Sequence, residues 1–340
     1  MREPQDALRA WNLPISIRPA DDGLINRTYF VGPGPDAVLQ WVNPIFSTAV
    51  QLDIHALTER LAAAGLETPH LIPTRTGALQ LEESSGFWRA MTFIPGSTFH
   101  RLTSPDQAVA AGELLGRFHR ALLDWKPQLQ APSRRIHDTV GHMRTLESAL
   151  DACDGHALEA PARRLGRQIL DAWRAWDGEL EQPERMCHGD PKISNLRFDE
   201  TGRRGVCMVD LDTIGPQTLS AEMGDAWRSW CNPAGEEDPA GCRFDLDLFA
   251  ASAKGWRGAL GELDEDELRS VVPGIERICL ELAARFCADA VQNTYFREDR
   301  ARFAEPGSHN LLKAEGQMNL ARSALAHRER CERLLRQAEP

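Results

Sequence analysis

Two polar segments that flank a short apolar strand constrain this chain more than any other feature. The first, residues 188–195, opens with His-Gly-Asp and ends in Asn, and the second, residues 209–212, reads Val-Asp-Leu-Asp. The apolar run 206–209 predicts a strand, so the two polar segments belong to one short hairpin. That hairpin places two carboxylates and an amide around a common point.

Phosphoryl transfer from a nucleotide needs this set of groups, because a carboxylate accepts the proton of the attacking hydroxyl while an amide and a second carboxylate hold Mg²⁺. The catalytic loop of protein kinases spaces its Asp and Asn in the same way. We therefore predict that Asp190 is the catalytic base and that Asn195 and Asp210 bind Mg²⁺, with ATP as the nucleotide. Lys192 could reach the transferred phosphate or lie solvated at the surface. His188 is expected to be structural.

Composition and charge are those of an ordinary globular protein. A length of 340 residues allows one large domain or two lobes with a core each. The formal net charge of −11 argues against a nucleic-acid or anionic-membrane surface. The eight cysteines are scattered without a Cys-x-x-Cys pair, and no apolar stretch approaches a membrane span. We expect a cytoplasmic protein whose partners are a nucleotide and a small molecule.

The chain divides into a strand-rich and a helix-rich part. Residues 1–94 are predicted to form a small antiparallel β lobe, with strands at 15–18, 28–31, 37–43, 79–81 and 88–94 and one helix at 48–64. Residues 95–340 are predicted to form a larger, mainly helical lobe, with helices at 108–125, 158–180, 263–272, 274–296 and 311–335. The catalytic hairpin at 186–214 interrupts these helices, and residues 231–245 are expected to form a surface loop near the site.

These segments resemble the aminoglycoside phosphotransferase and choline kinase family, which shares the protein-kinase fold. The resemblance is carried by residues 186–214, the hinge-like run 91–96, the helix 114–119 and the pair Gly224-Asp225. It implies a two-lobed α+β fold whose hinge backbone, around Met91 and Phe93, holds the adenine. It also implies that Asp212 is a further metal contact and that the Gly-Asp pair braces the catalytic loop.

A narrower resemblance is to the N-acetylhexosamine 1-kinases, which phosphorylate the anomeric hydroxyl of free GlcNAc or GalNAc. It rests on short stretches at 23–29, 39–46, 293–296, 308–311 and 317. The implied acceptor is a sugar. Trp227 and Arg228 are predicted to face the mouth of the site, although a tryptophan there fits the core equally well. Asp245, Tyr295 and Asn310 are further candidates for substrate binding.

The segment 22–28 is predicted to cover the phosphates of the nucleotide. Its backbone N–H groups and the Asn26 amide can donate to phosphate oxygens, Gly23 permits the turn, and Thr28 closes the segment. A plain β-hairpin turn explains the same residues.

The third strand departs from the kinase pattern. Kinases place a lysine there to contact the α- and β-phosphates, but this chain has Gln40 and contains no lysine before Lys126. Either Gln40 donates a neutral hydrogen bond to the nucleotide, or an arginine such as Arg27 or Arg89 supplies the charge.

Several alternative functions are consistent with part of these observations. Choline, ethanolamine, homoserine, an aminoglycoside or N-acetylmuramate would be phosphorylated by the same chemistry. An aminoglycoside needs an acidic pocket, for which residues 236–238 and 245–247 are available. A nucleotide-binding pseudokinase scaffold is supported by the absent lysine and opposed by the complete set of catalytic groups. A metal-dependent hydrolase using His188 and Asp190 lacks a second histidine at ligand spacing.

Overall fold

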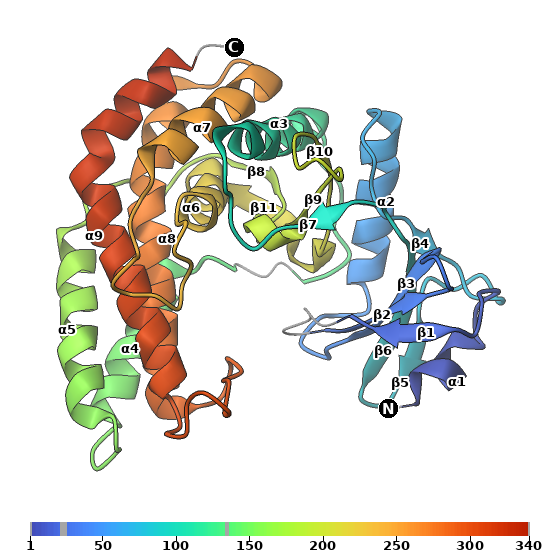
Figure 1. Ribbon diagram of the computed structural model, residues 1–340, viewed down its shortest axis with the longest axis horizontal. Helices are drawn as coiled ribbons and strands as arrows, with labels where there is room; N and C mark the ends of the chain where they lie inside the picture. The colour runs from blue at the N-terminus through green and yellow to red at the C-terminus, as the bar shows by residue number, and fades with distance from the viewer. Residues whose placement is uncertain (1, 21–25, 133–135, 339–340) are drawn as a thin grey trace.

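The computed structural model describes residues 2–20, 26–132 and 136–338, which form two lobes (Figure 1). The small lobe, at the blue end of the colour scale, is a six-stranded sheet with two helices, and the large lobe is mainly helical. The α+β, two-lobed architecture predicted from the sequence is confirmed. The predicted boundary at residue 94 falls between the last strand of the small-lobe sheet and the first strand of the large lobe.

Strand alternation gives the small-lobe sheet two buried faces. Its elements are α1 (Pro4–Leu8), β1 (Ile17–Pro19), β2 (Arg27–Val31), β3 (Ala37–Val42), α2 (Val50–Ala63), β4 (Leu71–Ile72), β5 (Leu81–Glu83) and β6 (Gly86–Thr92). The strands are antiparallel in the order β1-β2-β3-β6-β4, and β5 also pairs with β6. One face packs on α1 through Trp11 and Trp88, and the other packs on α2 through Ile54 and Phe87.

Most of the large lobe is helix, with two short sheets at its centre. Its elements are β7 (Ser97–Thr98), α3 (Pro105–Leu122), α4 (Thr139–Asp151), α5 (Glu159–Ala175), β8 (Glu184–Cys187), β9 (Leu196–Phe198), β10 (Gly205–Met208), β11 (Gly215–Thr218), α6 (Leu219–Trp230), α7 (Leu246–Leu260), α8 (Glu265–Gln292) and α9 (Ser308–Gln337). The sheets are β10-β9-β7 and β11-β8. In Figure 1 the helices α4, α5, α8 and α9 lie on the side away from the small lobe.

The helix predictions need correction at one break and at the helices that were missed. The predicted break near residue 273 is absent, because α8 continues through Pro273 as one helix of 28 residues. A proline inside a helix removes one backbone hydrogen bond, and here the packing of α8 against α6 and α9 holds the helix together. The helices α1, α4, α6 and α7 were not predicted; in α6 every residue except Ser229 is buried, so its polar side chains do not mark an exposed face.

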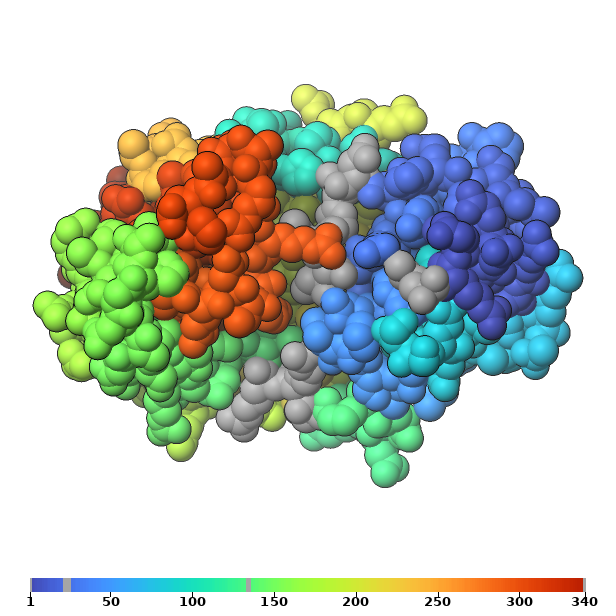
Figure 2. Space-filling model, turned by 90° about the horizontal axis from the view of Figure 1, so that it is seen from below, coloured from blue at the N-terminus to red at the C-terminus, as the bar shows by residue number. Residues whose placement is uncertain are grey.

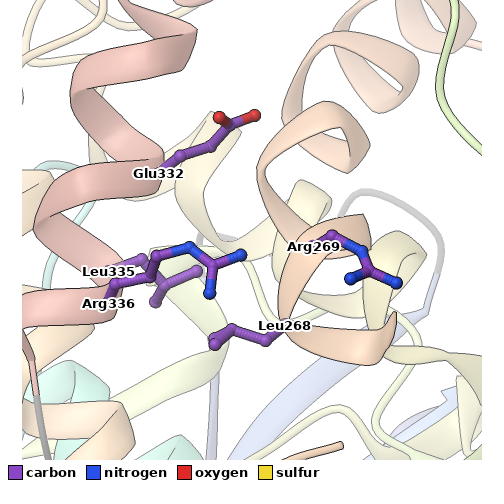
Figure 3. Close-up of a pocket in the computed structure, with 5 residues that line it drawn as sticks. All are labelled: Leu268, Arg269, Glu332, Leu335 and Arg336. Carbon is purple, nitrogen blue, oxygen red and sulfur yellow. The ribbon is translucent and has the colours of Figure 1, made fainter. Parts of the chain in front are cut away.

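The segment between α8 and α9 reaches from the helical side toward the small lobe, as the space-filling view in Figure 2 shows. A separate pocket of about 210 Å³ lies between the start of α8 and the end of α9 (Figure 3). Its lining contains no residue of the catalytic hairpin. No described helix is long and apolar enough to cross a membrane.

Helices α3 and α7 approach closely because glycines line their contact. A Cβ atom added to Gly112 would lie 2.0 Å from the carbonyl oxygen of Ser252, and one added to Gly255 would lie 2.2 Å from that of Val109. These distances leave no room for a methyl group. The two helices therefore pack backbone to backbone.

We predict opposite effects for alanine at two helical glycines. Gly112→Ala forces α3 and α7 apart and should lower the free energy of unfolding by about 1–3 kcal/mol. Gly258→Ala, on the exposed side of α7 where nothing lies within 4 Å of the added methyl, should raise it by about 0.5–1 kcal/mol. Urea unfolding measures both changes, and a destabilised Gly258→Ala would contradict the packing explanation.

Candidate active site

The catalytic hairpin brings together the four residues predicted to act on phosphate. Strand β8 leads into the loop that carries Asp190, and the β9–β10 hairpin returns the chain to Asp210, whose neighbour Val209 donates its N–H to the Asn195 carbonyl at 2.9 Å. The Asn195 amide donates to the Asp190 backbone carbonyl at 2.8 Å and to its carboxylate at 3.1 Å. These bonds use the NH₂ group of Asn195 and leave its amide oxygen available.

Lys192 lies against the predicted base. Its ammonium group contacts the Asp190 carboxylate directly. Burial on its own would lower the pKa of Lys192, but Asp190 and Asp210 raise it above its ordinary value. Burial likewise opposes ionisation of Asp190, but Lys192 outweighs it and lowers the pKa of that carboxyl. Both groups are therefore charged at neutral pH.

The Asp210 carboxylate is suited to a cation. Asp210 has a left-handed backbone conformation, with φ 64° and ψ 57°, which aspartate tolerates better than most residues. No described residue donates a hydrogen bond to its carboxylate, and the residue is exposed to solvent. Partial loss of hydration beside the surrounding protein, followed by repulsion from Asp212, raises the pKa of Asp210. Asp210 and the free oxygen of Asn195 are the hard oxygen donors that Mg²⁺ prefers.

Asp212 is an ion-pair partner in this structure, which corrects its prediction as a metal contact. Arg89 of β6 binds it with two parallel hydrogen bonds, Nη1 to Oδ1 at 2.5 Å and Nη2 to Oδ2 at 2.9 Å. The Asn26 amide adds a bond to Oδ2 at 2.8 Å. Both oxygens are thus occupied, and the side chain is only 1% exposed.

Glu222 of α6 holds the catalytic loop from the opposite side. Its two carboxylate oxygens accept the backbone N–H groups of His188 and Gly189, both at 2.9 Å. Trp256 donates to Nδ1 of His119, so the other ring nitrogen of His119 carries the proton that points at Glu222. Sequence reasoning missed Glu222, although it stands two residues before the predicted Gly-Asp pair.

The Gly224-Asp225 pair has another role than the one implied by the family resemblance. A Cβ atom on Gly224 would lie 2.4 Å from the Gly274 carbonyl oxygen, so this glycine is the crossing point of α6 and α8. Asp225 pairs with Arg228 at 2.8 Å. Among the described residues of α6, Glu222, Ser229 and Trp230 make the hydrogen bonds that brace the loop.

His188 is structural, as predicted. It is fully buried, its Nε2 donates to the Val209 carbonyl at 3.0 Å, and its Nδ1 accepts the Asp190 N–H at 3.3 Å. The buried group of His119, Cys187 and Glu222 has ligand atoms close enough for a metal, but its carboxylate is already occupied by the bonds described above. Burial keeps the pKa of the Cys187 thiol well above its ordinary value. Neither His188 nor the group of His119, Cys187 and Glu222 therefore supports a hydrolytic metal centre.

Of the residues predicted on the nucleotide side, Thr28, Gln40 and Met91 lie on one face of the small-lobe sheet. Gly23 lies outside the described residues. Gln40 donates to the Thr28 hydroxyl at 3.1 Å and accepts from Arg89 at 2.9 Å, so its amide is held inside the sheet. The side chain of Met91 is buried in the core. The nucleotide roles of these residues stay predictions.

The hinge is fastened to the large lobe by an arginine that sequence reasoning missed. Arg197 of β9 donates to the carbonyls of Ile94 and Gly96 at 2.9 and 2.6 Å. Its guanidinium also lies 5.5 Å from the centre of the Phe93 ring. Phe93 therefore packs between the lobes, where its predicted backbone contact with adenine remains to be tested.

Some of the residues predicted to bind the phosphoryl acceptor lie in the core, and others lie at the surface. Trp227 has no exposed surface, packs on Phe249 and Trp256, and donates to the Ser252 hydroxyl. Its prediction as a substrate contact is wrong, because packing encloses it on all sides. Asp245 caps the N-terminus of α7 by accepting the N–H groups of residues 247 and 248, so its carboxylate is committed to the fold.

Tyr295 lies in the connection between α8 and α9, and Asn310 lies in the first turn of α9. Asn310 is fully buried and donates to Asp289 at 3.1 Å, which corrects its prediction as a direct substrate contact. Asp289 also accepts the N–H groups of residues 294, 295 and 296 and thereby shapes this connection. Tyr295 is 52% exposed and remains a candidate for substrate binding. Arg228 is buried between Asp225 and Glu236.

The fold and the site define a two-lobed small-molecule phosphotransferase of the protein-kinase type. Residues 16–261 match the sequence profile described as "Phosphotransferase enzyme family", and the chain belongs to that family.

Solved structures with the same fold are distant in sequence. The chain is similar to a microcompartment-associated aminopropanol kinase, with a TM-score of 0.65, 17% identity, and coverage of 95% of this chain and 97% of that one. It is similar to an amicoumacin kinase solved with AMP-PNP and Ca²⁺ (TM-score 0.62, 13% identity, coverage 93% and 91%). An aminoglycoside phosphotransferase from Alicyclobacillus acidocaldarius matches with a TM-score of 0.60, 15% identity and 97% coverage of both chains. At these identities the likeness shows the fold.

We predict that Glu222→Gln disturbs the catalytic loop as well as the fold. The amide keeps one acceptor oxygen but turns an NH₂ group toward a buried backbone N–H, so the free energy of unfolding should fall by about 1–3 kcal/mol. The rate of phosphoryl transfer should fall too, while nucleotide affinity stays nearly constant. Urea unfolding and steady-state kinetics measure these changes.

Glu281→Gln is the matched control, because Glu281 is equally buried and bonds to His137 and Thr139 outside the catalytic loop. We expect a similar loss of stability with little loss of turnover. Equal loss of turnover in the two variants would count against a positioning role for Glu222.

Proposed function

We propose that this phosphotransferase moves the γ-phosphoryl group of Mg·ATP to the anomeric hydroxyl of an N-acetylhexosamine such as GlcNAc or GalNAc. The observation that carries the phosphoryl-transfer part is the Asp210 carboxylate. It lacks a hydrogen-bond donor among the described residues, has a raised pKa, and lies in the electrostatic reach of the Asp190–Lys192 pair. A divalent cation would satisfy this carboxylate.

The chain's own residues divide the work as follows. Asp190, kept ionised by Lys192, accepts or orients the proton of the acceptor hydroxyl. Asn195 and Asp210 would hold Mg²⁺, which neutralises the phosphate oxygens when it is bound. Lys192 is free to exchange Asp190 for the transferred phosphate, since its flexible stem and point charge suit an anionic group.

Nucleotide and metal are supported by a neighbour's ligands. The amicoumacin kinase of the same fold was solved with an ATP analogue and a divalent cation, and we extend both to this chain, with Mg²⁺ as the physiological ion. The eight cysteines are all free and buried, which supports a reducing, cytoplasmic compartment.

A neutral acceptor is favoured because Glu236 and Glu237, two of the acids available for a cationic one, are already paired. Glu236 accepts from Arg228 at 2.6 Å and from Gln317 at 3.2 Å. Glu237 accepts from Arg302 at 2.6 Å and from His309 at 2.9 Å. An aminoglycoside or choline would need such carboxylates free to receive its ammonium groups. Their pairing supports a sugar over these alternatives.

The acceptor is tested with a panel of free sugars and amino alcohols. ADP release should depend on GlcNAc or GalNAc, and phosphorus NMR of the product should place the phosphate on C1. Phosphocholine or an aminoglycoside phosphate as the main product would overturn the sugar proposal and leave the kinase class intact. Tight Mg·ATP binding with no turnover on any acceptor would favour a scaffold.

We predict that Asp190→Asn abolishes turnover with little effect on Mg·ATP binding. The amide cannot accept the proton, and loss of a general base typically lowers the rate about 10²–10⁴-fold. Calorimetry gives the nucleotide affinity and ADP release gives the rate. Asp171→Asn, a surface substitution on α5, serves as the control and should match the wild type. Near wild-type turnover in Asp190→Asn would show that the base is assigned to the wrong residue.

A further inference from the structure

The small lobe lacks both halves of the ion pair on which kinases rely. That pair joins a lysine on the third strand to a glutamate on the neighbouring helix. Here β3 carries Gln40 at the candidate position. The candidate acid on α2, Glu59, has a side chain 63% exposed and lies 3.5 Å from His70 on the surface. Gln40 and Glu59 are not in contact with each other.

Arg89 occupies the place that the lysine leaves vacant. Strands β3 and β6 pair in a register that sets Arg89 directly opposite Gln40. Both residues lie on the sheet face that Phe87 and Met91 present to α2. The guanidinium donates its Nε proton to the Gln40 carbonyl oxygen at 2.9 Å. Of the arginines in the described part of the small lobe, Arg89 alone is buried, with 1% of its surface exposed.

The counter-ion of Arg89 comes from the metal-binding turn instead of from α2. Asp212 lies in the 3-10 turn Leu211–Thr213, which directly follows Asp210. It receives both Nη groups of Arg89 and the amide of Asn26. Asn26 in turn accepts the N–H of Asn43 at 3.0 Å. The Asp212 carboxylate of the large lobe therefore connects three parts of the structure. It binds Asn26 at the end of the predicted phosphate segment and Arg89 in the sheet, and it belongs to the turn that carries Asp210.

We propose that Arg89 is the small-lobe cation of this enzyme, moved from the third strand to β6, and that its ion pair with Asp212 positions Asp210 and Asn26 for the triphosphate of the nucleotide. The inference rests on the proposed phosphoryl transfer. Arg89 is a positioning residue, since it acts through Asp212. Its planar fork fixes the angle between the sheet and the turn, which the single point charge of a lysine does less well.

The proposal predicts that Arg89 matters for phosphates and not for adenosine. Arg89→Gln should weaken binding of Mg·ATP and Mg·ADP at least tenfold, while adenosine affinity changes less than twofold, because only the phosphates and metal depend on the Asp210 turn. Calorimetry with the three ligands measures this without any acceptor. A merely structural role would weaken all three ligands alike, and that result would overturn the proposal.

A swapped pair of residues tests whether the cation itself is what β6 supplies. Gln40→Lys combined with Arg89→Gln returns the charge to the third strand and keeps an amide opposite it. Mg·ATP affinity should recover to within about threefold of the wild type, an allowance of well under 1 kcal/mol. A folded double variant that binds as weakly as Arg89→Gln would contradict the proposal.

Two further variants keep the test decisive. Arg60→Gln removes another cation that joins the lobes, through its bond to the Ala121 carbonyl at 2.9 Å, and should leave Mg·ATP affinity unchanged. If Arg89→Gln does not fold, Asp212→Asn removes the counter-ion and should weaken Mg·ATP at least threefold with adenosine unaffected; no selective loss there would overturn the proposal. Wild-type protein that binds no nucleotide would instead refute the proposed function.

Discussion

The buried ion pair between Arg89 and Asp212 is the contact on which the geometry of the site depends. Moving two charged groups out of water has a larger free-energy cost than pairing them at the surface, so a buried ion pair adds little net stability. What this pair does supply is a fixed geometry, because the two parallel hydrogen bonds at 2.5 and 2.9 Å allow one relative orientation of β6 and the turn that carries Asp210. The neutral amides of Gln40 and Asn26 complete the hydrogen bonding of both charged groups.

The catalytic hairpin is held near its two ends by two carboxylates of the large lobe, one in the hairpin itself and one in α6. Asp212 ties the end of the hairpin to the small-lobe sheet, and Glu222 ties its beginning to α6 through two backbone N–H groups. Burial opposes the charge on Glu222, but the hydrogen bond from His119 leads the groups that lower its pKa. The loop can therefore keep Asp190 and Asp210 close together although both are negative, with Lys192 between them.

The local sequence was sufficient to predict the catalytic hairpin but not the residues that hold it in place. Asp190, Asn195 and Asp210 lie within one short stretch, so their meeting could be predicted from a strand and two turns, and the amphipathic period of α2 and α3 identified those helices. Glu222 and Arg89 act across separations of 33 and 123 residues, which periodicity does not report, so Glu222 was missed and Arg89 was named only as one of two possible small-lobe cations. Trp227 and Asn310 were assigned to substrate because nothing local distinguishes a tryptophan or asparagine of the core from one at a site.

Pairing among charged groups also underlies the proposal of a neutral acceptor. The chain is acidic overall, yet near Arg228 the carboxylates of Asp225 and Glu236 share one buried guanidinium, and Glu237 is shared by Arg302 and His309. A carboxylate already bound in this way offers little to an ammonium group, since the existing partner must first be displaced. This pairing is what supports the proposed sugar acceptor, because hydroxyl and acetamido groups do not need a free carboxylate as ammonium groups do.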